Sequence, residues 1–415
     1  MLIFRKNIYK PRSLWYNSRM IDGSFNEIER REDLLRLFRT AYGTSPTRFF
    51  SSPGRAEIVG NHTDHNLGKV LVSAISCDIL CAAAPRDDDI VEIRADAFNP
   101  IRFSVHDLVS REREKGKSVS LARGVLFYLA QQGYSFGGFS ACTHSTVFRG
   151  AGVSSSAAFE VLVAEIVNRL YLGGRLSPAE KARAGQFAEN VFYGKPCGLL
   201  DQSGIAFGGL NKIDFGSGEP LVEQLPTLSG YKLVLTNTGG SHSGLTAHYA
   251  DVKREMAEVA AYFGKSYLRE VSAGKLRDEL PRLRKRVSDR AILRAFHFFE
   301  ENDRVERAAD ALRRADAPAF FAQITGSGQS SLSFLQNCYI SGETDQPIVL
   351  ALKMSEKILK DGAYRMQGGG FTGTVLAFVK EGSEREYGRE MARVFGRENV
   401  YYTDVRETGA CEIEI

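Results

Sequence analysis

Apolar residues recur at two different periods in the first quarter of the chain. Leu34, Phe38 and Tyr42 fall on one face at helical spacing, and Gly43 can end such a helix. From about residue 49 to residue 103, apolar runs such as VLVSAISCDILCAAA are bounded by Pro, Gly and Asp. Such runs are typical of β-strands. We therefore expect one helix followed by a group of strands.

The middle of the chain alternates between the two patterns. Helical spacing predicts helices over residues 121–132, 157–171 and 178–193, and the run FSACTHSTV predicts a strand over residues 139–147. A loop rich in Gly and Ser separates this strand from the apolar helix after it. The segment CGLLDQSGIAFGG follows the last of these helices.

Helices dominate the last third of the chain. After a turn-rich segment at residues 216–230, the run YKLVLTNTG predicts a new strand, and we place a domain boundary there. The helices expected beyond it lie at 244–263, 274–287, 289–315 with breaks, 346–361 and 384–396, and the strands TVLAFVK and VYYTDV flank the last helix. The mixture predicts an α+β fold in two lobes. Its parts are an N-terminal appendage at 1–20, a first domain at 21–228 and a second domain at 229–415.

Composition narrows the functional class. The 415 residues include 54 basic and 50 acidic side chains, and a net charge of +4 gives no reason to expect nucleic-acid binding. The basic N-terminus lacks the apolar core of a signal peptide, and no stretch reaches the ~18 apolar residues of a membrane helix. The six cysteines are scattered, without the spacing of a metal site or a disulfide framework. We expect a cytoplasmic enzyme, monomeric or weakly self-associating, that does not contact membranes.

The first of three glycine-rich segments is PGRAEIVGNHTDHNLG at residues 53–68. Between Gly60 and Gly68 it gathers short-range hydrogen-bonding groups, which suits a ligand with many hydroxyls. Two alternatives stay open: an Asx-rich turn without a ligand, and a metal site. The polar side chains of this turn are those of Asn61, His62, Asp64, His65 and Asn66, of which His62, Asp64 and His65 are the possible metal ligands.

The second segment, RGAGVSSSAA, lies between a β-like run and an apolar helix. Backbone N–H groups at a helix start, with hydroxyls beside them, form an anion site, and glycines let a phosphate approach the main chain. The Gly-Lys-Ser/Thr ending of a Walker A loop is absent. The alternative is a simple Ser cap on the helix.

The third segment, GGGFTG at residues 368–373, satisfies G-x-G-x-x-G formally. A dinucleotide fingerprint needs a helix after it, whereas TVLAFV follows here, so the Rossmann interpretation fails. A tight turn that closes over a ligand, or one that only packs two backbones together, remains.

In this order, the three segments resemble the GHMP kinase superfamily and, within it, the galactokinase family. The family's sugar signature G-R-x-N-L-I-G-E-H-T-D-Y-N-x-G is similar to GRAEIVGNHTDHNLG, its phosphate loop G-G-G-L-S-S-S-A to GAGVSSSA, and its third motif G-G-G-F-G-G to GGGFTG. A fourth motif, A-E-x-x-F-x-G-x-P-C-G-I-M-D-Q, resembles AENVFYGKPCGLLDQ. The resemblance implies a two-lobed GHMP-kinase-like fold with its active site in the cleft between the lobes.

The resemblance also implies roles for individual residues. Asp201 matches the catalytic base at the anomeric hydroxyl of galactose, and Arg55 lies beside it; without the family, Asp201 reads as an ordinary turn residue. Ser156 and Glu189 match the ligands of a Mg²⁺ ion that accompanies the co-substrate ATP, although Glu189 alone reads as part of a solvated helix face. The implied sugar contacts are Asn61, His62, Asp64, Gly198 and Tyr249, and the implied ATP-binding residues are Gly150, Gly152, Ser154, Ser155 and Ser156.

At two positions of the sugar signature, this chain has the residue types of the family motif in exchanged order. Glu57 stands where the family has Asn, and Asn61 where it has Glu, so we predict an amide and a carboxyl exchanged within one hydrogen-bonded pair. In the family that Glu faces the C6 hydroxyl, and an amide there suggests tolerance of galacturonate. Galactose is the expected substrate, with galacturonate, N-acetylgalactosamine and a catalytically silent sugar sensor as alternatives. The presence of Arg55, Ser154, Glu189 and Asp201 argues against the sensor.

Overall fold

Two β-sheets organise the chain. The computed structural model describes residues 27–95, 99–147, 152–239 and 245–414, and the predicted appendage at 1–20 lies outside them. The large sheet has the order β12-β1-β2-β5-β3-β4, with β6 and β7 branching from β2, and the small sheet has the order β11-β8-β10-β9. The strands of the large sheet are β1 Arg48–Val59, β2 Lys69–Pro85, β3 Ile90–Ala95, β4 Ile101–Ser104, β5 Phe139–Ser145, β6 Leu210–Ser217, β7 Glu219–Leu225 and β12 Cys411–Ile413. Those of the small sheet are β8 Tyr231–Asn237, β9 Gly362–Gln367, β10 Thr374–Lys380 and β11 Val400–Thr403.

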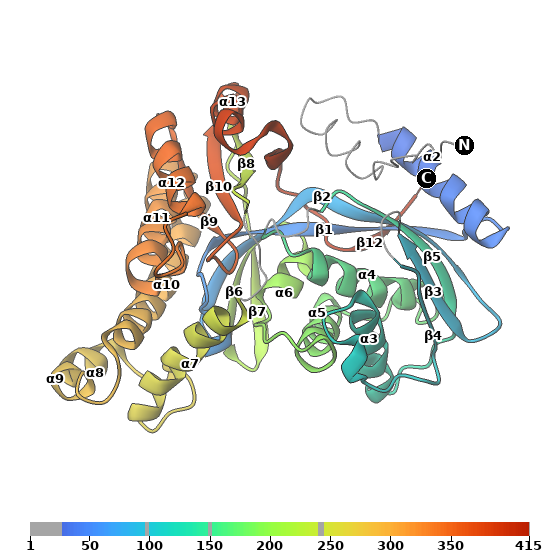
Figure 1. Cartoon of the computed structure of the whole chain (residues 1–415), viewed down its shortest axis with the longest axis horizontal. Coiled ribbons are helices and arrows are strands. Elements are labelled where there is room, and N and C mark those ends of the chain that lie inside the picture. Colours follow the sequence, from blue (N-terminus) through green and yellow to red (C-terminus); the bar gives the residue numbers. More distant parts are fainter. Residues whose placement is uncertain (1–26, 96–98, 148–151, 240–244, 415) are drawn as a thin grey trace, which may run out of the picture.

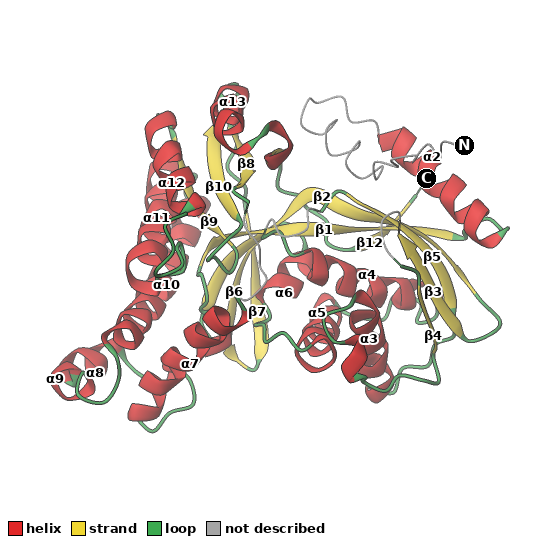
Figure 2. Cartoon of the chain, in the orientation of Figure 1, coloured by secondary structure: helices red, strands yellow, loops and turns green. Residues whose placement is uncertain are grey.

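Helices cover both sheets. Figure 1 shows α3, α4, α5 and α6 together on one face of the large sheet and α2 on its other face. In Figure 2, α10, α11 and α12 lie as a group beside the small sheet. The first-half helices are α2 Glu27–Tyr42, α3 Ser118–Gln131, α4 Ser155–Leu170, α5 Pro178–Phe187 and α6 Leu200–Phe207. The second-half helices are α7 Thr246–Tyr262, α8 Ala273–Asp278, α9 Leu280–Leu283, α10 Asp289–Arg313, α11 Ala317–Ser330, α12 Pro347–Ile358 and α13 Glu384–Phe395. No described helix is both long and apolar enough to cross a membrane.

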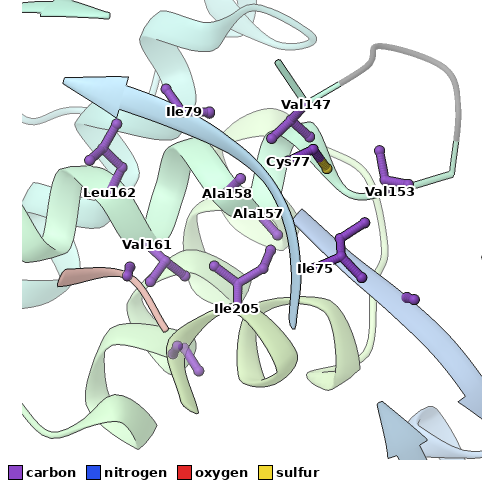
Figure 3. Close-up of a cluster of buried hydrophobic side chains, with 14 of the residues drawn as sticks. Ile75, Cys77, Ile79, Val147, Val153, Ala157, Ala158, Val161, Leu162 and Ile205 are labelled. Atoms are coloured by element: carbon purple, nitrogen blue, oxygen red, sulfur yellow. The ribbon is translucent and has the colours of Figure 1, made fainter. Parts of the chain in front are cut away.

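The apolar face of α4 packs under the centre of the large sheet. Its residues Ala157, Val161 and Leu162 are fully buried and lie close to Ile75 and Ile79 of β2 (Figure 3). This burial explains why the apolar run after the serine loop forms a helix, because each buried Val or Leu side chain contributes about 1.5–3 kcal/mol when it leaves water. The packing holds the start of α4 against β1 and β2.

One hydrophobic core joins the two sheets. The cluster that contains Ala56 and Ile58 of β1 also contains Leu233 of β8, Phe320 of α11 and Phe378 of β10. Because these side chains share one core, the elements built around the two sheets are packed together. A site between them is therefore held by both halves of the chain.

The helix α2 is fixed to the far face of the large sheet. Leu34 and Phe38 are buried there, as their spacing predicts. Arg30, also buried, forms an ion pair with Asp78 of β2 at 2.5 Å. The last turn ends at Gly43, whose φ is +70° and whose N–H donates to Arg39, as expected of a helix-ending glycine.

Several elements differ from the predicted pattern. The segment predicted to be turn-rich contains the edge strand β7, whose polar composition resembles a turn because only β6 pairs with it. The helix predicted with breaks, α10, is continuous over 25 residues. Apart from β7, the helices and strands without a counterpart in the prediction are α6, α11, β6, β9 and β12.

The missed helix α6 shows why the pattern failed. Its sequence LDQSGIAF contains Ser and Gly, which are poor helix formers. A Cβ atom at Gly204 would lie 2.6 Å from a methyl group of Val72, so a larger residue would hold the helix away from β2. The domain boundary near residue 229 stays a prediction; β12, the last strand, lies in the large sheet beside β1.

Candidate active site

A carboxylate, a guanidinium and a hydroxyl meet at the start of α4. Arg55 Nε and Nη2 lie 2.8 and 2.7 Å from Asp201 Oδ1, and Ser154 Oγ donates to Asp201 Oδ2 at 2.5 Å. Arg55 also donates to the carbonyl of Gly152. The side chain of Arg55 is buried, whereas that of Asp201 is 26% exposed, so this carboxylate is accessible to a ligand. The predicted convergence of Arg55 and Asp201, 146 positions apart, is confirmed.

Local backbone geometry brings these groups together. The pairing of β1 with β2 shifts register at Pro53/Gly54, directly before Arg55. A Cβ atom at Gly54 would lie 2.9 Å from Cys77 Sγ and 3.1 Å from the carbonyl oxygen of Val153. Only glycine lets β1 approach the serine loop this closely, and Arg55 N–H donates to that carbonyl at 3.2 Å.

The serine loop does not act as a simple helix cap. Ser154 precedes α4 with φ +61°, and its side chain donates to Asp201 instead of capping the helix. Among the described residues no side chain caps the first turn of α4, so its N–H groups suit an anion. Gly152 lies beside this turn with φ +64°, and Ser155 begins the helix. The fifth predicted ATP-binding residue of this segment, Gly150, lies outside the described residues.

Glu189 is buried beneath the same loop. Its side chain is 1% exposed, and its Oε1 accepts from Ser156 Oγ at 3.1 Å and from Lys195 Nζ at 2.9 Å. The solvated-face alternative is therefore wrong for Glu189. A π-helical turn over Ala188–Tyr193 changes the helical period here, a feature that is frequent at functional sites.

A second buried carboxyl lies behind Glu189. The side-chain N–H₂ of Gln202 donates to Glu160 at 2.9 Å and to Glu189 at 3.0 Å. Burial, followed by the charge of Glu189, raises the pKa of Glu160 well above its usual range. Neither Glu160 Oε1 nor Gln202 Oε1 has a hydrogen-bond partner among the described residues. The sequence prediction missed Glu160, Gln202 and Lys195, although all three lie in or directly after the serine loop and the fourth motif.

The donor set at Ser156 and Glu189 fits a hard cation. A hydroxyl and a carboxylate oxygen 3.1 Å apart offer two ligands, and Mg²⁺ usually takes one or two protein oxygens together with phosphates. No cluster of three or more His, Cys, Asp or Glu side chains suited to a metal occurs in the described part of the chain. The alternative metal site at His62, Asp64 and His65 therefore gains no support.

Asp64 connects the sugar-signature turn to the start of α6. It accepts from the N–H of Leu200 at 3.2 Å and from that of His65 at 3.0 Å. Burial opposes its charge, but the contacts with His65 and Leu200 lower the pKa of Asp64 to about 2. A Cβ atom at Gly198 would lie 1.7 Å from Asp64 Oδ2, so glycine is required there. Asp64, Gly198 and Asp201 are thus brought to one place.

His62 and Tyr249 hold the third glycine-rich turn. His62 Nε2 lies 3.0 Å from the carbonyl oxygen of Gly369, and Tyr249 Oη donates to that of Gly370 at 3.0 Å. Burial, with the neighbouring His65, lowers the pKa of His62 to about 4. The turn therefore packs against the sugar signature and α7, where elements of both sheets meet.

The predicted pair of Glu57 and Asn61 is present. Asn61 Nδ2 donates to Glu57 Oε1 at 2.7 Å and to the carbonyl of Gly368 at 2.9 Å, and Asn61 Oδ1 accepts from Asn337 at 2.8 Å. Arg365 forms an ion pair with Glu57 at 3.0 Å. Asn61 is 0% exposed, so it differs from the other predicted sugar contacts: the protein itself occupies both its donor and its acceptor.

Comparisons with known proteins identify relatives of this chain. A galactokinase galactose-binding signature matches residues 36–85, and a GHMP kinase N-terminal domain matches residues 120–209. The chain is 30% identical to a galactokinase of Pyrococcus furiosus over 83% of its own length and 92% of the relative, and 31% identical to one of Homo sapiens over 90% and 94%. A crystal structure of Lactococcus lactis galactokinase with galactose aligns with a TM-score of 0.80 and 22% identity, covering 93% of this chain and all of the other. A mevalonate kinase structure from Methanococcus jannaschii aligns with a TM-score of 0.60 at 14% identity, covering 86% and 98%.

Proposed function

Since the chain belongs to the galactokinase family, we propose that it transfers the γ-phosphate of ATP to the anomeric hydroxyl of galactose, giving galactose 1-phosphate. The observation that carries the proposal is the contact of Arg55, Ser154 and Asp201 at the uncapped start of α4. There, a partly exposed carboxylate lies beside a helix end that suits phosphate. We place the enzyme in the cytoplasm, as a monomer or weak homo-oligomer.

Asp201 accepts the proton of the sugar hydroxyl in this proposal. Its Oδ1 is held by Arg55 and its Oδ2 by Ser154, which fixes the plane of the carboxylate. Phosphoryl transfer depends mainly on positioning and on neutralising charge, so a strong base is not required. Arg55, beside the base, neutralises charge that develops on the reacting oxygens.

The serine loop and Glu189 bind the nucleotide side. Backbone N–H groups at the start of α4 donate to phosphate oxygens, and Gly152 lets the phosphates approach the main chain. Ser156 and Glu189 would hold a Mg²⁺ ion, which, when bound, neutralises phosphate charge and orients the nucleotide. Gln202, bonded to both Glu160 and Glu189, fixes the Glu189 carboxylate in place.

Asp64 and its neighbours bind the sugar in this proposal. The carboxylate of Asp64 has a low pKa and accepts hydrogen bonds from ring hydroxyls; His62, Gly198 and Tyr249 complete the pocket. Asn61, whose amide is occupied by Glu57 and Gly368, acts by holding the turn.

The pair of Glu57 and Asn61 favours galactose over galacturonate. The carboxyl that the family motif places at position 61 is present in the same hydrogen-bonded pair, contributed by Glu57. Asn61 has no amide hydrogen left for a C6 carboxylate, because both are used within the protein. We therefore expect the side chains near the C6 group of the sugar to carry the same net charge as in the family motif.

A turnover assay tests the proposal. ATP consumption is measured with galactose, galacturonate and N-acetylgalactosamine, and we expect galactose to give the highest kcat/KM. A higher kcat/KM with galacturonate would reverse the argument from Glu57 and Asn61. Tight sugar binding without turnover on any of these sugars would favour the silent sensor.

A further inference from the structure

Lys195 lies beside Glu189 at a variable position of the fourth motif. Its Nζ is 2.9 Å from Glu189 Oε1, and the same oxygen accepts from Ser156 Oγ at 3.1 Å. The Lys195 side chain is 49% exposed, whereas Glu189 is buried. A half-exposed lysine thus extends its ammonium to a buried carboxylate that also accepts from Ser156.

The surroundings keep this ammonium charged. Its Nζ lies 2.9 Å from Glu189 Oε1, and the charge of Asp201 also acts on it. Glu160 is a third carboxyl near Glu189, and it contacts Gln202 rather than Lys195. Lys195 is therefore the counter-ion of Glu189 when no ligand is bound.

A divalent cation on Ser156 and Glu189 conflicts with this ion pair. Mg²⁺ requires its oxygen ligands at about 2.0–2.1 Å, and it repels an ammonium that is bonded to the same carboxylate oxygen. The side chain of Lys195 has a flexible four-carbon stem and is half exposed, so it can move away from Glu189. Phosphates held at the serine loop would then offer this ammonium negative charge, as the nearby carboxylate of Asp201 does.

We propose that Lys195 is an exchangeable counter-ion of the nucleotide site. It pairs with Glu189, which also accepts from Ser156, when the site is empty, and it binds phosphate oxygens of the nucleotide when a metal ion takes its place. The inference rests on the proposed function only for the location of the triphosphate. It adds to that function a lysine that contacts the nucleotide and couples metal binding to nucleotide binding.

Two binding measurements on Lys195→Met test the proposal. Mn²⁺ binding to the nucleotide-free protein is followed by the electron paramagnetic resonance signal of free Mn²⁺, and binding of a non-hydrolysable ATP analogue with Mg²⁺ is followed by calorimetry. Because the variant removes a competitor for Glu189, we expect Mn²⁺ to bind about tenfold more tightly. Because it also removes a phosphate contact, we expect the analogue to bind about tenfold more weakly.

Two further variants serve as controls. Lys195→Arg keeps the charge and should bind both probes within about threefold of the wild type. Lys115→Met is a matched lysine control: the alkyl chain of Lys115 lies over Gly194, but its Nζ pairs with the exposed Glu112 at 2.7 Å. We expect this variant to bind both probes as the wild type does.

The opposite directions of the two changes separate this role from a structural one. If Lys195→Met leaves both affinities unchanged, or weakens both together with a lower melting temperature, the proposal is overturned. A wild-type protein that binds the analogue but phosphorylates no sugar rejects the proposed function. The two affinities of Lys195→Met still decide the role of Lys195 in that case.

Discussion

The nucleotide side of the site and the network around Glu57 in the sugar signature differ in how exposed their polar groups are. On the nucleotide side Asp201 is partly exposed, Lys195 is half exposed, and Glu160 and Gln202 each carry a buried oxygen without a partner among the described residues. In the network around Glu57, Asn61 and Arg365 are fully buried and bonded to the protein, whereas His65 Nε2, in the same turn as Asn61, is buried without a partner among the described residues.

The difference indicates that the two groups of residues have different roles. Buried polar networks that are satisfied fix a single conformation, whereas exposed or unpartnered polar groups are ready to bind a ligand. In the network around Glu57, only Asn337 Oδ1 lacks a hydrogen-bond partner among the described residues. This network therefore holds the turn in shape, and the groups around Asp201 are available for chemistry. Changes on the two sides should consequently affect different measurements.

Asp201→Asn should have the largest effect on turnover. It removes the acceptor of the hydroxyl proton but keeps an oxygen toward Arg55, so kcat should fall by about 10²–10⁴-fold. Sugar and nucleotide affinities, measured by calorimetry, should stay within a few fold of the wild type. Asp361→Asn is the control, because Asp361 forms an exposed pair with Lys380 at 3.1 Å. Turnover of Asp201→Asn within tenfold of the wild type would exclude Asp201 as the base.

Gly198→Ala should break the connection between the two sides. The new methyl group would overlap Asp64 Oδ2, which must then leave its place beside α6. A displacement of about 1 Å near reacting groups can cost about 100-fold, so kcat/KM for galactose should fall by that factor. Nucleotide affinity should be nearly unchanged. Gly274→Ala is the matched control, since the nearest atom to its new Cβ is 3.9 Å away, and an effect of Gly198→Ala no larger than that of this control would remove the steric argument.

The sequence predicted the local elements and the separate motifs better than their supporting contacts. The helix at Leu34 and Phe38 follows from spacing, and the meeting of Arg55 with Asp201 follows from the family resemblance. The position of Lys195 on Glu189 depends on a π-helical turn that no period in the sequence marks. The partners Arg365 and Asn337 come from distant segments, so only the tertiary fold reveals that they surround Asn61.

The exchanged pair can be tested by exchanging it back. Glu57→Asn leaves Arg365 without its carboxylate, and Asn61→Glu places a second carboxyl beside Glu57. Each single change should lower the free energy of unfolding by about 3 kcal/mol, as is typical when one partner of a buried pair is lost. The double variant rebuilds a carboxyl–amide pair and should recover at least half of the summed loss in denaturant titrations. Additive losses would show that the two residues do not act as a unit, and nucleotide affinity should change little in any of the three.

The last expected effect, confined to acidic solution, is a pH dependence of stability on the sugar-signature side. The pKa of His62 is about 4 in the fold against an ordinary 6.5, because burial and His65 disfavour its charged form. Below pH 6.5 the unfolded chain binds a proton that the folded chain does not, so stability is full above pH 6.5 and falls between pH 6.5 and 4. The pKa difference corresponds to about 3 kcal/mol. Burial also lowers the pKa of His144 and His297, so the wild-type slope contains their contributions. His62→Gln should remove only the contribution of His62, so the unfolding free energy of the variant should change less between pH 4 and 6.5 than that of the wild type. Parallel profiles of variant and wild type would show that His62 does not titrate differently in the fold.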